Sequence, residues 1–125
     1  MVRKALNSWK RRQFEYGDSD CCQFVAHVLL ELTGKDYIHA FGYNSEKGAE
    51  EILAEHGGME GLVSFALQTL PSEDFGDGDP VIVDLPIVGE AMGIKFGTEV
   101  VCLTKKGMAR VNERYITKGW KICHQ

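Results

Sequence analysis

Apolar residues recur every three or four positions through the first 70 residues of the chain, a spacing that predicts helices. The clearest helix is predicted over residues 20–33, where one face carries the apolar side chains Phe24, Val25, Val28, Leu29 and Leu32. Asp18, Ser19 or Asp20 can cap its start, and Gly34 follows its end, where a left-handed residue is favoured. We also predict a short basic helix over residues 2–13, a helix from Ser45 to about His56 and another from about Met59 to Leu70.

After Pro80 the pattern changes to short β-prone runs separated by glycines. Lys105-Lys106-Gly107 predicts a tight hairpin turn. Helices followed by an antiparallel sheet indicate an α+β fold, with a helical part over about 1–70 and a sheet part over about 80–125 of one domain, 1–125. The predicted strands, about five in number, cover residues 80–85, 91–96, 98–104, 108–112 and 120–124.

Composition narrows the possible partners. The 125 residues are 44% hydrophobic, enough for one domain with a real core, and the net charge is −4. Such a balance argues against a nucleic-acid surface, which would be basic. No window approaches the run of about 18 apolar residues that crosses a bilayer, and the start of the chain lacks the apolar segment of a signal peptide. We therefore expect no membrane span and no nucleic-acid partner, and a protein kept in the cytosol unless a larger assembly exports it.

The start of the helix predicted over 20–33 carries the strongest chemical signal, a thiol at Cys21. Unpaired N–H groups at a helix N-terminus stabilise an anion, so a cysteine there tends to ionise readily. The four cysteines are better explained individually than as a metal site, although Cys21, Cys102, Cys123 and His124 could in principle gather around an ion. We expect no metal and no cofactor, and we expect the other three cysteines to be buried as small hydrophobes.

An acidic turn precedes the predicted sheet and contains Asp74, Asp77 and Asp79. It lacks the Asp-x-Asp-x-Asp-Gly order of an EF-hand calcium-binding loop, and it also lacks the distal glutamate of such a loop. A solvated turn is the simpler interpretation.

The segment around Cys21 resembles the nucleophile motif of NlpC-like cell-wall peptidases, a branch of the papain-like cysteine hydrolases. Tyr16-Gly17 and Asp20-Cys21-Cys22-Gln23-Phe24-Val25 match that motif, and Gly78-Asp79 resembles the family's entry to its first strand. The resemblance implies a papain-like fold, with Cys21 as nucleophile and the backbone N–H of Cys22 as an oxyanion donor. It also implies that Tyr16 and Asp20 contribute to substrate binding.

More narrowly, the chain is similar to small NlpC-like proteins encoded among phage tail genes. The residues that carry this similarity are Thr33-Gly34-Lys35-Asp36, Tyr43, Gly48-Ala49, Leu53, Gly57-Gly58 and Trp120. It implies other tail proteins as partners, and a virion-tail location after synthesis in the host cytoplasm.

One departure from the family pattern changes the functional expectation. The catalytic histidine of these peptidases begins a strand that aligns with Ala91-Met92-Gly93-Ile94, so alanine stands at the position of the general base. Losing such a group costs about 10²–10⁴-fold in rate. His27 should face away from Cys21 on its helix, and His39 and His56 read as surface residues, which leaves His124 as the best substitute base.

Three functions remain open at this point. The first is a degenerate papain-like domain retained as a structural or assembly component of a phage tail. The second is an active cysteine endopeptidase or amidase that acts on peptidoglycan peptides through Cys21. The third is a module that binds cell-wall peptide without cutting it. The alanine at position 91 favours the first.

Overall fold

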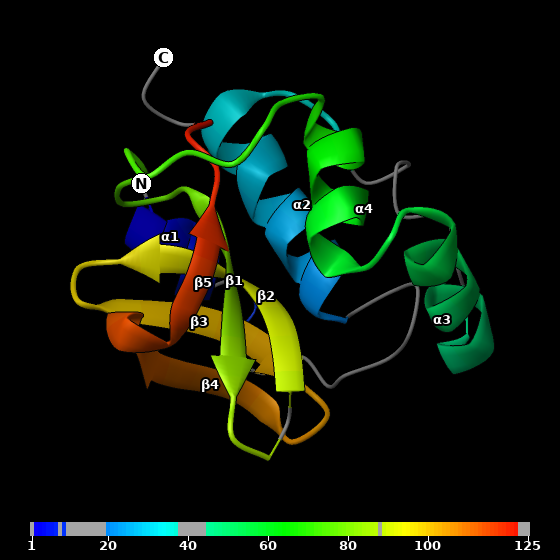
Figure 1. Cartoon of the computed structure of the whole chain (residues 1–125). Coiled ribbons are helices and arrows are strands. Elements are labelled where there is room, and N and C mark those ends of the chain that lie inside the picture. Colours follow the sequence, from blue (N-terminus) through cyan, green and yellow to red (C-terminus); the bar gives the residue numbers. More distant parts are fainter. Residues whose placement is uncertain (1, 8, 10–19, 38–44, 88, 123–125) are drawn as a thin grey trace.

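The structure is a computed structural model that describes residues 2–7, 9, 20–37, 45–87 and 89–122. It is an α+β fold in which helices precede an antiparallel five-stranded sheet (Figure 1), as the sequence predicts. The helices of the described part are α1 (Val2–Asn7), α2 (Cys21–Thr33), α3 (Glu46–Glu55) and α4 (Met59–Leu67). Within this part, no helix has the length and apolar character needed to cross a membrane.

The predicted helix ends are confirmed where a capping residue defines them. Asp20 caps α2 by accepting a hydrogen bond from the backbone N–H of Gln23 at 2.8 Å, and Gly34 ends it with a φ of 77°. Ser45 caps α3 in the same way. The helix predicted to reach Leu70 ends earlier, because Gln68 adopts the left-handed conformation with a φ of 55°.

The N-terminal helix is also shorter than predicted. α1 ends at Asn7 and Trp9 lies in a turn, buried against the ring of Phe24. The rest of the segment predicted to be helical, residues 8 and 10–13, lies outside the described residues.

The sheet has the strand order β4-β3-β2-β1-β5, and its paired strands run antiparallel. The predicted hairpin turn is confirmed between β3 and β4. The strands are β1 (Pro80–Leu85), β2 (Gly89–Phe96), β3 (Glu99–Thr104), β4 (Gly107–Asn112) and β5 (Ile116–Gly119).

The prediction of the last strand at 120–124 is wrong for residues 120–122, and residues 123 and 124 lie outside the described residues. A 3₁₀ turn, η2 (Glu113–Tyr115), leads into β5, which pairs with β1 four residues earlier than predicted. The apolar Trp120 and Ile122 suggest a strand, but both follow the end of β5 and are buried in the main core, with one last backbone bond from Trp120 N–H to the carbonyl of Pro80 at 3.0 Å. Trp120 instead donates its indole N–H to Ser64 on α4 at 3.1 Å.

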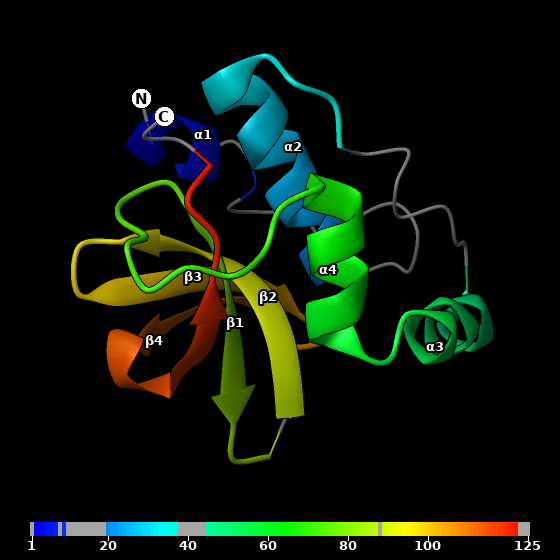
Figure 2. The same ribbon diagram turned by 45° about the horizontal axis from the view of Figure 1, so that its top comes forward.

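Side chains alternate between two apolar clusters across the sheet. The larger cluster joins the sheet to α1, α2 and α4, which pack over it (Figures 1 and 2), and the smaller cluster contains Val81, Val83, Ala91 and Val100. In both views α3 lies beyond α4, at the outer edge of the helical layer. Helix α2 thus packs on the sheet, whereas α3 lies at the periphery of the fold.

The acidic turn before β1 corrects one prediction. Asp79 is fully buried rather than solvated, and its carboxylate accepts the backbone N–H groups of Gly76 and Ile122, each at 2.9 Å. Asp77 accepts the backbone N–H of Gly97 at 2.8 Å. The turn is therefore a structural clamp that ties the C-terminal segment to the entry of β1.

Candidate active site

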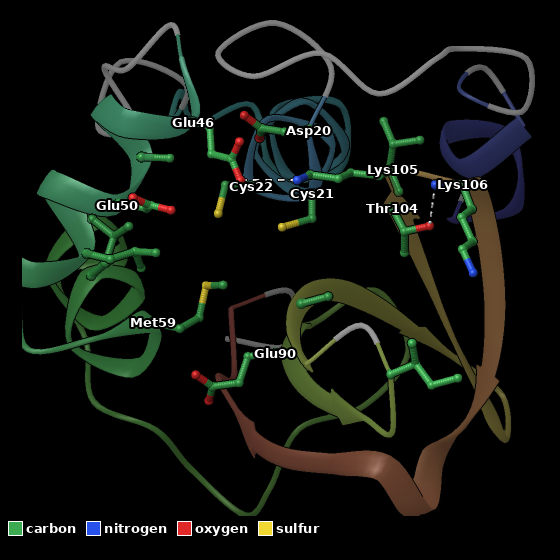
Figure 3. A pocket seen from close by; sticks show the side chains of 16 residues that line it. Asp20, Cys21, Cys22, Glu46, Glu50, Met59, Glu90, Thr104, Lys105 and Lys106 are labelled. Carbon is green, nitrogen blue, oxygen red and sulfur yellow. Dashed lines mark hydrogen bonds and ion pairs between the residues drawn. The ribbon is translucent and has the colours of Figure 1, made fainter.

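Cys21 lies at the wall of a cavity of about 450 Å³ at the N-terminus of α2. Cys21 as a residue is half-buried, and the sulfur atoms of Cys21 and Cys22 lie next to each other at the cavity (Figure 3). The cavity is formed by the start of α2, by α3 and α4, by the beginning of β2 and by the end of β3 with the turn that follows. Segments far apart in the sequence thus converge on Cys21.

Hydrogen bonds to the sulfur favour the thiolate of Cys21. The thiol of Cys22 is the largest influence that lowers the pKa of Cys21, and the backbone N–H groups of Met92 and Cys22 lower it further. Burial and the carboxylate of Asp20 raise the pKa, but the net direction is downward. The site therefore holds a thiol that ionises more readily than an ordinary cysteine.

Met92 can reach the thiol because two strands separate at this point. The register between β2 and β3 runs from Phe96↔Glu99 to Ile94↔Val101, and no pairing extends to Met92. The backbone N–H of Met92 is therefore directed at Cys21 instead of at a neighbouring strand. Cys102 lies nearby on β3, where burial and the charge on Cys21 raise its pKa to about 12, so it stays protonated.

Ala91 occupies the cavity wall next to this contact. It is buried, it pairs with Val83 on β1, and it immediately precedes Met92, while its methyl group packs with Val81, Val83 and Val100 in the smaller cluster. The position that the sequence resemblance assigns to a catalytic histidine is therefore at the site, and its side chain is a methyl group. A methyl group can neither accept the thiol proton nor deliver one to a leaving group.

The described histidines lie elsewhere. The ring of His27 packs against that of Trp9, tilted by 46° with the centroids 5.2 Å apart, so it faces away from Cys21. Nδ1 of His56 lies 2.9 Å from the carbonyl oxygen of Ile52, and its ring packs on Phe65 at 4.6 Å. Neither lines the cavity, so no described residue that does so is a histidine. His39, His124 and Tyr16 lie outside the described residues, so the base proposed at His124 stays a prediction.

Asp20, the predicted binding residue that lies within the described part of the chain, lines the cavity but is almost fully buried. Only 1% of its surface is exposed, and its carboxylate caps α2. Within the described part of the chain, no three His, Cys, Asp or Glu residues form a group that could hold a metal ion.

Sequence reasoning missed the charged rim of the cavity. Nζ of Lys105 lies 3.2 Å from Oε1 of Glu46, which joins the β3–β4 turn to the first turn of α3. Glu50, Glu90 and Lys106 also line the cavity, and Figure 3 shows them around its opening. The spacing of Glu46 and Glu50 on one helix face and the two adjacent lysines are visible in the sequence, but their apposition depends on the tertiary fold.

Comparison with known proteins gives a family without giving an activity. No match to a curated protein is found. The model of one family, described as a domain of unknown function (DUF6950), matches residues 1–122. Because this match covers nearly the whole chain, the protein belongs to the DUF6950 family.

Proposed function

We propose that this protein is a papain-like, NlpC-type domain that retains the nucleophile of a cysteine peptidase without its general base, and that it serves as a structural component of a phage tail. The observation that carries the proposal is Ala91, a buried alanine that lines the cavity and stands beside Met92, the residue whose backbone contacts Cys21. The nucleophile half of the site is thus retained, while the half that moves protons is absent at the matching position.

The chemistry explains why a reactive thiol alone gives little turnover. A thiolate held by the Cys22 thiol and the Met92 N–H can attack an electrophile. Peptide cleavage then requires a proton for the leaving amine and a base for the water that hydrolyses the thioester. Without a positioned acid–base group, each of these steps slows by about 10²–10⁴-fold.

Two features support a papain-like arrangement. The cysteine begins a helix, α2, that packs on β2 and β3, and the antiparallel sheet follows the helices in the chain. The Tyr16-Gly17 and Asp20-Cys21 motif and the residues similar to small tail-encoded proteins support the phage-tail role. Other tail proteins are the proposed partners, in the virion tail.

A second candidate is an active cysteine endopeptidase or amidase on peptidoglycan peptides. It is favoured by the lowered pKa of Cys21 and by the cavity next to its sulfur. In this alternative the backbone N–H of Cys22 helps to bind the oxyanion, and a group other than residue 91 supplies the base.

Restoring the missing base tests the proposal. We expect the wild type to be alkylated at Cys21 but to show no turnover of peptidoglycan fragments, and Ala91→His to gain cleavage by about 10²–10⁴-fold over the wild-type background. Ala91→Asn is the control for bulk and polarity, and the double variant Ala91→His, Cys21→Ala should be inactive. Circular dichroism checks that the larger side chain is tolerated at this buried position.

The outcomes separate the two candidates. Wild-type cleavage over many turnovers that depends on Cys21 would establish the peptidase and reject the degenerate site. The tail role is tested separately by mass spectrometry of purified virions and tail intermediates of a phage that encodes the chain, and absence from all of them would reject it.

A further inference from the structure

An ion pair spans the opening of the cavity. Glu46 on the first turn of α3 and Lys105 on the β3–β4 turn both line the cavity, and their charged atoms are 3.2 Å apart. Figure 3 shows this contact beside the side chains of Cys21 and Cys22. We propose that the Glu46–Lys105 pair is a latch that restricts access of ligands to Cys21 by holding the first turn of α3 to the β3–β4 turn.

The lysine side of the latch is fixed. The β3–β4 ladder extends to the Thr104↔Gly107 pair, so Lys105 and Lys106 occupy a tight turn. The hydroxyl of Thr104 donates to the carbonyl of Gly107 at 3.0 Å and accepts the N–H of Lys106 at 3.2 Å. Lys105 is thereby presented from a rigid support.

The glutamate side belongs to a weakly anchored helix. Ala49 is the one buried residue of α3, and the helix packs chiefly on α4. Its end leads into Gly57 and Gly58, which have positive φ values of 76° and 107° and join α3 directly to α4. A rotation of α3 about this glycine pair would separate Glu46 from Lys105 and widen the opening.

The exposure of the pair limits its strength. The side chains of Lys105 and Glu46 are 61% and 59% exposed, so water and salt screen their attraction. Exposed pairs of this kind shift an equilibrium by roughly 1.4- to 5-fold. The latch therefore adjusts how often the cavity opens and does not seal it.

Alkylation of Cys21 by a small neutral electrophile measures this opening, and the test rests on Cys21 being the reactive group of the proposed site. Rates are read by peptide mapping at low salt, on the high-pH plateau where the thiol is ionised in every variant. We expect Glu46→Gln and Lys105→Met each to speed labelling by roughly 1.4- to 5-fold, and high salt to do the same to the wild type.

Two matched variants control for the change in local charge. Glu50→Gln lies on the same helix and Lys106→Met on the same turn, and both residues line the cavity, but among the described residues neither belongs to an ion pair. These variants should label at the wild-type rate. The exchanged pair Glu46→Lys, Lys105→Glu should restore slow labelling.

The result separates failure of the latch from failure of the proposed function. If Cys21 reacts but the pair variants match their controls, the latch is rejected while the thiol site stands. If Cys21 is inert in every variant, amide hydrogen exchange of residues 49–53 decides: faster exchange in Glu46→Gln than in Glu50→Gln supports the latch, and equal exchange rejects it.

Discussion

The floor and the rim of the cavity are built in opposite ways. The floor, formed by Cys21, Cys22 and Ala91 with the backbone of Met92 behind them, comes from a helix start and a central strand, and its groups are held by the core and the backbone. The rim consists of exposed charges, with Glu46 and Glu50 on a peripheral helix, Lys105 and Lys106 on a hairpin turn, and Glu90 near the start of β2. The difference indicates that the reactivity of the thiol is fixed by the fold, whereas access to it is adjustable.

Substitution of Gly93, on the strand that forms the floor, should have the largest effect on the free energy of unfolding if the floor is rigid. A Cβ there would lie 2.6 Å from Cγ1 of Val100 and 2.8 Å from the carbonyl oxygen of Val101, and backbone cannot move aside easily. We expect Gly93→Ala to lower the free energy of unfolding by about 1–3 kcal/mol through overpacking, as measured by urea denaturation.

Gly119 provides the control for this substitution. A Cβ at Gly119 would meet the ring of Phe75, a side chain that is itself partly exposed and can rotate away. Gly119→Ala should therefore cost less than Gly93→Ala. Equal losses, or a neutral Gly93→Ala, would show that the floor adapts and would remove the contrast with the rim.

Substitutions of Asp20 test whether the stability of α2 and the pKa of Cys21 can be changed separately. Its carboxylate caps α2 and its charge raises the pKa of Cys21. Asp20→Asn keeps a cap but removes the charge, so the pKa of Cys21 should fall and the pH midpoint of alkylation should move down. Asp20→Ala should also lower the midpoint, and in addition it should cost about 0.5–2 kcal/mol of stability through loss of the cap.

Two measurements distinguish the capping role of Asp20 from its electrostatic role. Stability comes from chemical denaturation and the midpoint from the rate of Cys21 alkylation against pH. A midpoint that rises in Asp20→Asn would contradict the electrostatic role assigned to the aspartate, because removing a neighbouring negative charge can only favour a thiolate.

The floor was largely predictable from the sequence and the rim was not. Gly34 and Asp20, one of three candidate caps, end and begin α2 as predicted, because capping acts between residues close in sequence. The lowered pKa of Cys21 is predicted in direction, but the contribution of the Met92 N–H is missed because Met92 lies on β2. Asp79 was misread as solvated because its partner Ile122 is 43 positions away. The pairing of Glu46 with Lys105 was missed for the same reason, since their separation of 59 positions is closed only when the tertiary fold brings the first turn of α3 to the β3–β4 turn.

The rim should contribute least to stability. Because both members of the Glu46–Lys105 pair are more than half exposed, we expect Glu46→Gln and Lys105→Met each to lower the free energy of unfolding by only about 0.2–1 kcal/mol. The coupling between the two substitutions, measured by a double-mutant cycle in urea, should shrink as salt is added. A salt-independent coupling well above this range would mean that the pair anchors α3 as firmly as the core holds Cys21, and the distinction between a fixed floor and an adjustable rim would then fail.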